Sequence, residues 1–223
     1  MNGSVHEYGR GFPASAEGAR GAQRLDEEDD FELIRRVAAK DRKAFETLYY
    51  RYSPRLGRYL SRLLKQCELV EEALNDTLLV VWQNAARFDP SGRLLPWLYG
   101  IAHYKALKAL ARLSKRQSEL PLDYDDADAD ERNDHPRDPD NPEQALLRQD
   151  LGRVLAQAIE TLSPEHRAVV ELAFCEGFSY QEIATITECP VNTVKTRMFH
   201  ARRRLTHALA RLGLGSNGPK EAL

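Results

Sequence analysis

The stretch that decides the fold is SYQEIATITECPVNTVKTRMFHARRRL, residues 179–205. It opens with Ser179-x-x-Glu182, a capping box that predicts the start of a short helix. The residues ECP at 188–190 then predict a three-residue turn, and Pro190 is expected to start a longer, basic helix. A short capped helix, a tight turn and a longer helix are the outline of a helix-turn-helix, a motif that places its second helix in the DNA major groove.

The longer helix has two different faces. Its apolar side is expected to pack on the rest of the domain and consists of Val194, Met198, Ala201, Leu205, Ala208 and Leu212. Arg and Lys can bind phosphates or guanine edges, Asn and Thr can read bases, and an aromatic ring can contact a thymine methyl group. The candidate DNA-binding residues are therefore Asn192, Thr193, Lys195, Thr196, Arg197, Phe199, His200 and Arg203. A solvated basic helix is the alternative, and the capping box, turn and Pro190 favour DNA binding over it.

Charge is segregated along the chain, although the 223 residues carry a net charge of only −2. Residues 189–212 contain six Lys or Arg and no acid, whereas residues 119–143 contain eleven acids and two arginines. Such asymmetry is typical of proteins that bind nucleic acid or an anionic surface. The apolar content of 42% is enough to form a core, so the chain as a whole is expected to fold.

Helical periodicity continues upstream. Apolar stripes at steps of three and four predict helices within 45–63 and 70–85, preceded by a short helix in 29–41 and followed by one from about Leu94 to Arg116. Pro54 interrupts the first stripe and predicts a kink, or a restart capped by Ser53. Downstream, 143–162 is helical in pattern, and Ser163 and Pro164 predict an N-cap with Pro in the first helical position. We expect an all-α fold with two small helical domains joined by an acidic, flexible linker.

The helix predicted from Leu94 combines cations with aromatic rings. Lys and Arg recur along one stripe, and an apolar and aromatic surface lies beside it. Bases of opened, single-stranded DNA can stack on rings while cations follow the backbone. The candidate residues are Trp97, Ile101, Tyr104, Lys105, Lys108 and Arg112. For Trp97 and Ile101 a place in the core is the alternative.

The preceding helix carries an acidic face. In a DNA-binding domain such a face is expected to contact protein instead of DNA. The candidate protein-binding residues are Glu71, Glu72, Asn75 and Asp76.

Other classes of site find no support in the sequence. Cys67, Cys175 and Cys189 lie far apart without metal-ligand spacing, which indicates a reducing compartment, and we expect Cys175 and Cys189 to be buried as small apolar residues. His200 and His207 lack a third ligand, so no metal site is expected. A catalytic residue, a cofactor, a secretory signal and a membrane span are likewise not expected.

Four segments in chain order carry a family resemblance: DRKAFETLYYRYSPRLGRYL, VEEALNDTLLVVW, PWLYGIAHYKALKALAR and LSPEHRAVVELAFCEGFSYQEIATITECPVNTVKTRMFHARRRL. Together they resemble the extracytoplasmic-function sigma factors of bacterial RNA polymerase. The resemblance implies five parts: a flexible extension (1–25), a sigma region 2 domain (26–117), an acidic linker (118–142), a sigma region 4 helix-turn-helix domain (143–213) and a flexible tail (214–223).

The resemblance also implies a function. The protein would be a cytoplasmic promoter-specificity subunit, not an enzyme, with core RNA polymerase, promoter DNA and an anti-sigma factor as partners and no small-molecule substrate. The acidic face would bind core polymerase, the last helix would read the minus-35 element, and the region 2 residues would capture the opened minus-10 strand. His103 and Tyr104 stand where the family usually has Arg and Asn, and Asn75 where it usually has Gln. The family's Asn at the position of Tyr104 helps to read a promoter base. The family's base preference at the minus-10 element therefore cannot be transferred to this chain.

Two further hypotheses remain open. The acidic linker could occupy a cationic channel of polymerase as an RNA mimic, or it could be a solvated tether. The rival function is an autonomous helix-turn-helix repressor or activator, which would need a dimer interface and leaves the region 2 block unexplained. A recombinase would require a nucleophilic Ser or Tyr among activating arginines, and the sequence shows none in a recognisable setting.

Overall fold

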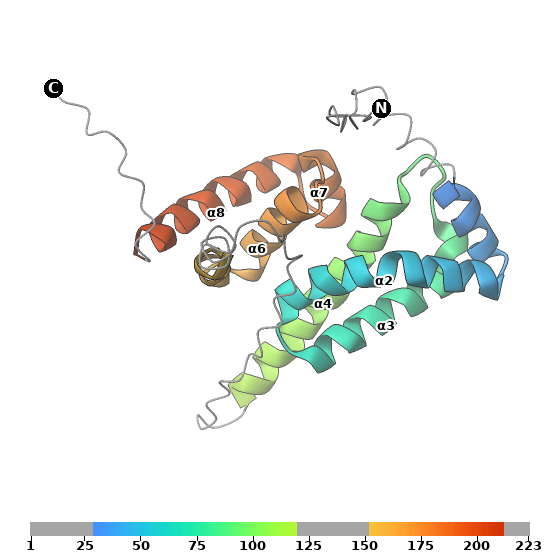
Figure 1. The fold of residues 1–223 in the computed structure, drawn as a ribbon, viewed down its shortest axis with the longest axis horizontal. Coiled ribbons are helices and arrows are strands. Elements are labelled where there is room, and N and C mark those ends of the chain that lie inside the picture. Colours follow the sequence, from blue (N-terminus) through green and yellow to red (C-terminus); the bar gives the residue numbers. More distant parts are fainter. Residues whose placement is uncertain (1–28, 120–151, 212–223) are drawn as a thin grey trace, which may run out of the picture.

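The computed structural model describes residues 29–119 and 152–211, and every regular element in these two ranges is a helix (Figure 1). The N-terminal domain contains helical residues 29–38, α2 (Arg42–Leu64), α3 (Cys67–Asn84), a 3₁₀ turn (Ala85–Arg87) and α4 (Leu94–Glu119). The C-terminal domain contains helical residues 152–160, α6 (Pro164–Val170), a π-helical turn (Glu171–Cys175), α7 (Tyr180–Ile186) and α8 (Val191–Arg211). The all-α prediction is confirmed. The extension 1–25, the tail 214–223 and nearly all of the linker 118–142 lie outside the described residues.

The N-terminal domain is a bundle of three long helices. α2 packs on both α3 and α4, and α3 packs on α4. Leu48, Leu56 and Leu60 of α2 are at most 1% exposed. They are spaced by eight and four residues, which puts them on one face of the helix, and each contributes about 1.5–3 kcal/mol by leaving water. The apolar stripe predicted within 45–63 is therefore the core face of α2.

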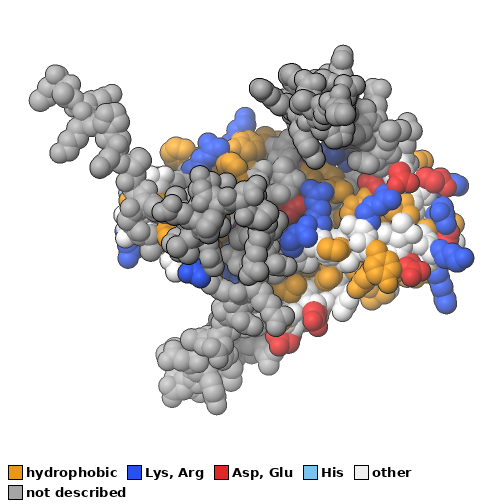
Figure 2. Space-filling model, in the orientation of Figure 1, with side chains coloured by type: hydrophobic (Ala, Val, Ile, Leu, Met, Phe, Trp, Pro, Cys, Tyr) orange, Lys and Arg blue, Asp and Glu red, His pale blue; other side chains and the backbone are white. Residues whose placement is uncertain are grey.

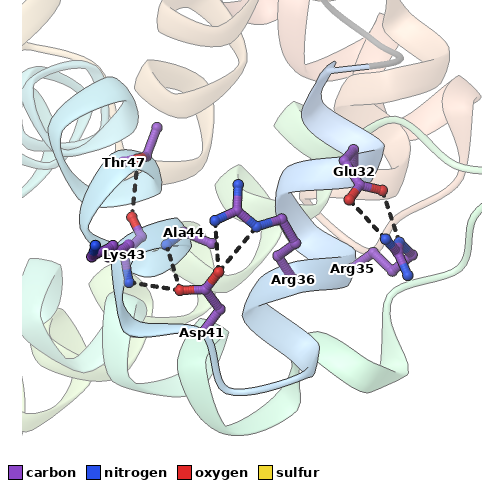
Figure 3. A network of polar contacts seen from close by, with 7 residues as sticks. All are labelled: Glu32, Arg35, Arg36, Asp41, Lys43, Ala44 and Thr47. Atoms are coloured by element: carbon purple, nitrogen blue, oxygen red, sulfur yellow. Dashed lines mark hydrogen bonds and ion pairs between the residues drawn. The ribbon is translucent and has the colours of Figure 1, made fainter.

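A polar network fixes the junction between residues 29–38 and α2 (Figure 3). The carboxylate of Asp41 caps α2 by accepting hydrogen bonds from the backbone N–H groups of Lys43 (2.9 Å) and Ala44 (3.3 Å). Arg36 donates to the same carboxylate at 2.6 and 3.0 Å, and this hydrogen bonding is the main reason why the pKa of Asp41 is lowered. Lys40, with φ 65°, lies just after the leading helix. The change of direction between the two helices is thus set by local residues.

The prediction of a restart at Pro54 is wrong, because α2 is continuous from Arg42 to Leu64. Pro54 lies on the exposed side, while Ser53 is buried and does not act as a cap. Tyr52 and Leu56, on either side of it, both pack in the core. This tertiary packing holds the helix together despite the backbone donor that proline lacks.

The caps of the C-terminal domain follow the prediction in part. The Ser179 side chain accepts from the backbone N–H of Glu182, and the Glu182 carboxylate accepts from the Ser179 N–H at 2.8 Å, so the capping box is present. Ser163 and Pro164 occupy the predicted N-cap and first helical positions of α6, but the Ser163 hydroxyl lies 2.5 Å from the imidazole of His166 and caps no backbone N–H. Pro190 lies one residue before α8, not inside it, and its carbonyl accepts from the first turn of that helix.

The two domains pack directly on each other, which the sequence did not predict. α7 lies against α4, and the buried apolar residues of both domains form one continuous cluster. Tyr99 of α4 and Phe178, just before α7, contribute an edge-to-face ring contact with centroids 5.0 Å apart. Gly100 lies close enough to α7 that a Cβ atom on it would be 3.9 Å from the carbonyl oxygen of Ile186. The helix-turn-helix is therefore held against the N-terminal bundle.

Candidate nucleic-acid interface

The outer face of α8 is exposed in the part of the chain that the structure describes. Val194, Met198 and Ala201 are buried, as predicted for the packing side. Six of the eight candidate DNA-binding residues are exposed: Asn192, Lys195, Thr196, Phe199, His200 and Arg203. The Phe199 ring is 63% exposed, and its ring contact is with the neighbouring His200, at 5.5 Å between centroids. This face offers phosphate-binding, base-reading and apolar groups together.

Thr193 and Arg197 differ from the other six. Both are half-buried. The Arg197 guanidinium lies 3.7 Å from the sulfur of Cys189, and its charge acts on His103 of α4 and on Glu165 of α6. Arg197 thus lies toward the domain interface in this arrangement.

Two aromatic contacts support the basic surface of the C-terminal domain. Arg202 of α8 lies over the ring of Phe174 at 5.8 Å, a cation–π contact, and Phe174 is 64% exposed. The rings of His166 and His200 lie 6.2 Å apart at right angles. Burial, followed by the charge of nearby Arg204, lowers the pKa of His166. A neutral imidazole is therefore favoured at this site.

On α4 the aromatic and basic candidates separate by exposure. Tyr104 is 60% exposed and Lys108 is exposed. Trp97 and Ile101 are half-buried and pack against the core, and the Trp97 ring contacts Phe88 with centroids 5.4 Å apart. The two alternatives for Trp97 and Ile101 thus both apply in part, because each side chain is shared between core and surface.

The acidic face of α3 and the basic stripe of α4 are paired with each other. Lys105 donates to Asp76 at 2.8 Å, and Arg112 donates to Glu72 at 2.8 Å. A small groove of about 40 Å³ separates the two helices at these pairs. Figure 2 likewise shows acidic and basic side chains interspersed over the N-terminal domain, at the right of the view.

Glu71 and Asn75 are exposed on the same helix. No ion pair of Glu71 is found among the described residues. The four protein-binding candidates therefore form two classes, two that are paired with α4 and two that face solvent.

A polar network that sequence reasoning missed joins α2 and α4 to the C-terminal domain. The Glu176 carboxylate accepts from the Arg55 guanidinium at 2.7 Å and from the Tyr99 hydroxyl at 2.6 Å. The Glu171 carboxylate accepts from Arg62 at 2.7 Å. Polar side chains on amphipathic helices are normally solvent-facing, so no pattern in the sequence marks these residues as contacts.

Two more groups at this interface are buried and polar. His103 of α4 is buried, its Nδ1 lies 2.8 Å from the Tyr59 hydroxyl, and burial lowers its pKa to about 4. Arg167 of α6 is buried and donates to the backbone carbonyls of Arg62, Glu160 and Leu162. Carbonyls at helix ends are favourable partners for a cation.

The expectation that Cys175 and Cys189 are buried is wrong. Cys67 and Cys175 are exposed and Cys189 is half-buried. Cys175 is exposed as a residue, but desolvation of its thiol, followed by a hydrogen bond with Glu171, raises the pKa of Cys175 to about 11, which makes this thiol a poor nucleophile. Within the described residues no cluster of three His, Cys, Asp or Glu could hold a metal ion, and no helix is long and apolar enough to cross a membrane.

Comparison with known proteins decides the family. A Sigma-70 region 2 model matches residues 48–116, and a Sigma-70 region 4 model matches residues 152–205. The ECF RNA polymerase sigma-E factor of Escherichia coli K12 is 30% identical over 173 residues, which cover 78% of this chain and 90% of the relative. This chain belongs to the ECF sigma factors. Sigma factors direct RNA polymerase to promoters, and the rival of an autonomous regulator is not favoured, since it leaves the region 2 match unexplained.

Other similar proteins agree with this assignment. The RNA polymerase sigma-H factor of Pseudomonas aeruginosa is 29% identical over 185 residues, covering 83% of this sigma factor and 96% of the relative. Two solved structures share the fold. CnrH in complex with the cytosolic domain of CnrY has a TM-score of 0.58 at 21% identity, covering 82% of this chain and 97% of that chain. The sigma factor RpoE in complex with the anti-sigma factor NepR from Bartonella quintana has a TM-score of 0.54 at 23% identity, covering 75% and 98%.

Proposed function

We propose that this sigma factor reads the minus-35 element with the outer face of α8 and holds the opened minus-10 strand at α4. In this proposal residues 26–117 form the region 2 domain, residues 118–142 the acidic linker and residues 143–213 the region 4 domain. The observation that carries the proposal is the outer face of α8, where six candidate residues are exposed on a helix whose other side is buried.

On α8 the candidates take different roles. Arg203, Asn192 and Thr196 are suited to hydrogen bonds with base edges, and the Phe199 ring is suited to a thymine methyl group. Lys195 is suited to the phosphate backbone, which positions the helix without reading sequence. Of the remaining candidates, His200 is exposed on this surface, and the half-buried Thr193 and Arg197 border it.

On α4, Tyr104 is the ring most available for stacking on an unpaired base, because it is the most exposed of the three aromatic or apolar candidates. Trp97 and Ile101 support it from the core side. Lys105, Lys108 and Arg112 follow along the helix and would track the phosphates of the same strand.

Core polymerase would bind at the acidic face of α3. Glu71 and Asn75 can contact a cationic surface directly because they are exposed. Glu72 and Asp76 can do so only by exchanging their present partners on α4 for cations of polymerase. Binding of polymerase to this face would therefore also release Lys105 and Arg112 for DNA.

The partners follow from the family. The proposal places this sigma factor in the cytoplasm, with its polymerase and promoter DNA, and assigns it no catalytic activity or cofactor. Both similar structures are of complexes, one with the cytosolic domain of CnrY and one with the anti-sigma factor NepR. They support the proposal that this chain too is held by an anti-sigma factor.

The test is transcription in vitro with core polymerase over a library of randomised promoters. Added sigma factor should select a defined pair of promoter elements. Arg203→Ala should change the preferred minus-35 sequence, whereas Lys195→Ala should lower transcription from all sequences alike. If no promoter in the library depends on the added chain, the proposal is wrong.

A further inference from the structure

Two imidazoles from different helices meet at the edge of the outer face of α8. The rings of His166 of α6 and His200 of α8 lie 6.2 Å apart at right angles, and α6 packs on α8. His200 is exposed and His166 is half-buried. His200 also contacts the exposed ring of Phe199, one of the candidate reading residues. The imidazole pair therefore extends the outer face of α8 onto a second helix.

Hydrogen bonds at the start of α6 orient the ring of His166. The Ser163 hydroxyl lies 2.5 Å from Nδ1 of His166. A hydrogen bond from its own backbone N–H is the main reason why the pKa of Glu165 is lowered, and one from the Ser163 hydroxyl acts in the same direction. Because the hydroxyl proton is directed to Glu165, the Ser163 oxygen is left to accept from Nδ1–H of His166. Nε2 is then the ring nitrogen that can take up a further proton.

Most of the charges that act on His166 are positive. Burial, followed by the charge of Arg204, lowers the pKa of His166, and His200 and Arg197 act in the same direction, while Glu165 opposes them. Arg204 is exposed and lies one helical turn beyond His200 on α8. A second proton on His166 is therefore disfavoured until a negative charge approaches.

The other elements that pack on α6 bring their charges to its buried side. Arg62 of α2 donates to Glu171 of the π-helical turn, and its carbonyl accepts from the buried Arg167 of α6. Among the described residues, the charges that act on His166 thus come from α6 and α8.

A phosphate group is the part of DNA that fits this position. An α-helix with its side chains is ~10–12 Å wide, and the major groove of DNA is ~12 Å wide. When α8 lies in the groove, a side chain on the helix packed beside it cannot enter and faces the sugar-phosphate backbone instead. A protonated imidazole donates from both ring nitrogens and forms charge-assisted hydrogen bonds with an anionic oxygen. His166 and the side of α8 next to it are thus suited to a phosphate.

We propose that His166 and His200 form a phosphate-binding site, carried by two helices, that takes up a proton when duplex DNA binds. The inference rests on the proposed function in one respect, that the outer face of α8 binds DNA. The phosphate stabilises the charged imidazole, so the bound state holds more protons than the free state and affinity rises as the pH falls. Uptake of one proton tightens binding by up to about tenfold per pH unit.

Binding of the full-length chain to a fluorescent duplex of mixed sequence tests this site. Fluorescence anisotropy is measured at pH 7.5 and pH 6.0 at one salt concentration, and a mixed sequence suffices because phosphate contacts do not depend on the bases. The variants are His166→Gln and His200→Gln, since Gln can hydrogen-bond but does not titrate. The matched control is His207→Gln, at an exposed position two turns beyond His200 on the same helix.

Wild type should bind the duplex about tenfold more tightly at pH 6.0 than at pH 7.5, and His207→Gln should show the same rise. His166→Gln and His200→Gln should each reduce the rise to about twofold or less. A rise of wild-type size in His166→Gln would overturn the two-helix site, and so would equal affinity of wild type at the two pH values.

A measurement on wild type keeps the test decisive if His166→Gln loses helicity by circular dichroism. Proton NMR follows the imidazole of His166 through a pH titration, with its signal assigned by comparison with the spectra of the His200→Gln and His207→Gln variants. The pKa of His166 should be higher with the duplex than without it, and the same pKa in both samples would overturn the site.

Failure of this site and failure of the proposed function give different results. A chain that binds the duplex with the expected pH dependence but selects no promoter with core polymerase would contradict the proposed function alone. Promoter selection together with binding that does not change with pH would contradict the phosphate-binding site alone.

Discussion

His103 should make the stability of the region 2 domain depend on pH, and His103→Gln should remove that dependence. The imidazole Nδ1 lies 2.8 Å from the hydroxyl of Tyr59 of α2, and the charges of Arg197 of α8 and Glu165 of α6 act on it. Burial and then the charge of Arg197 lower its pKa to about 4, against an ordinary value of 6.5, while Glu165 acts in the opposite direction. Gln can still accept a hydrogen bond from the Tyr59 hydroxyl but does not titrate.

The sign follows from which state binds more protons. Between pH 6.5 and pH 4 the unfolded chain holds a proton on this histidine and the folded chain does not, so stability falls as the pH falls. The full contribution is present above pH 6.5, and the loss is complete below pH 4. At pH 5.5 the difference in protonation corresponds to about 1.4 kcal/mol of lost unfolding free energy.

The measurement is urea unfolding at pH 7.5 and pH 5.5, followed by tryptophan fluorescence. Trp82 and Trp97 are both in the region 2 domain, so the signal reports on that domain. On acidification, wild type should lose about 1.4 kcal/mol more than His103→Gln, because all other titrating groups are common to both. His207→Gln, at an exposed position on α8, is the control and should behave as wild type. Equal losses in wild type and His103→Gln would refute the reasoning.

Three other outcomes are expected. Charge reversal of Glu71 should weaken capture of core polymerase in a pull-down at unchanged helicity. Charge reversal of Glu72 and Asp76 should also lower the midpoint of thermal unfolding, because their ion pairs with α4 are lost. If all variants capture polymerase as well as wild type does, α3 is not part of the interface. Arg203→Ala should cost about 1–3 kcal/mol in binding the minus-35 element, measured by competition, if it contacts a base; unchanged affinity would show that α8 does not lie in the groove. Replacing the five aspartates of 123–130 by Asn should alter the ratio of abortive to full-length RNA, and an unchanged ratio across several salt concentrations would contradict the RNA-mimic hypothesis.

Elements governed by local chemistry could be predicted from the sequence. The capping box at Ser179, the start of α4 at Leu94 and the buried side of α8 all follow from interactions within one or two helical turns. Pro54 does not interrupt α2, because its local effect is opposed by the packing of its neighbours. The same local reasoning could indicate which face of α8 is polar.

Contacts between distant helices could not be predicted in this way. The pairing of Glu72 with Arg112 and of Asp76 with Lys105 depends on how α3 lies against α4. The sequence shows an acidic helix and a basic helix but not that they neutralise each other. Arg197 turns toward the interface for the same reason, since only the packed domains bring its charge near His103 of α4.

The π-helical turn of Glu171–Cys175 has a mechanical consequence for the interface. At ordinary α-helical pitch, residues five apart point about 140° away from each other, so Glu171 and Glu176 could not both face α2. Here the Glu176 N–H bonds to the Glu171 carbonyl at 3.1 Å, which widens the turn and stacks the two residues one above the other. The arginines they meet, Arg55 and Arg62, are seven apart and lie on one side of α2. A return of this one turn to α-helical pitch would rotate a carboxylate away from its arginine without altering a single charge, so the winding of five residues sets the geometry of both ion pairs.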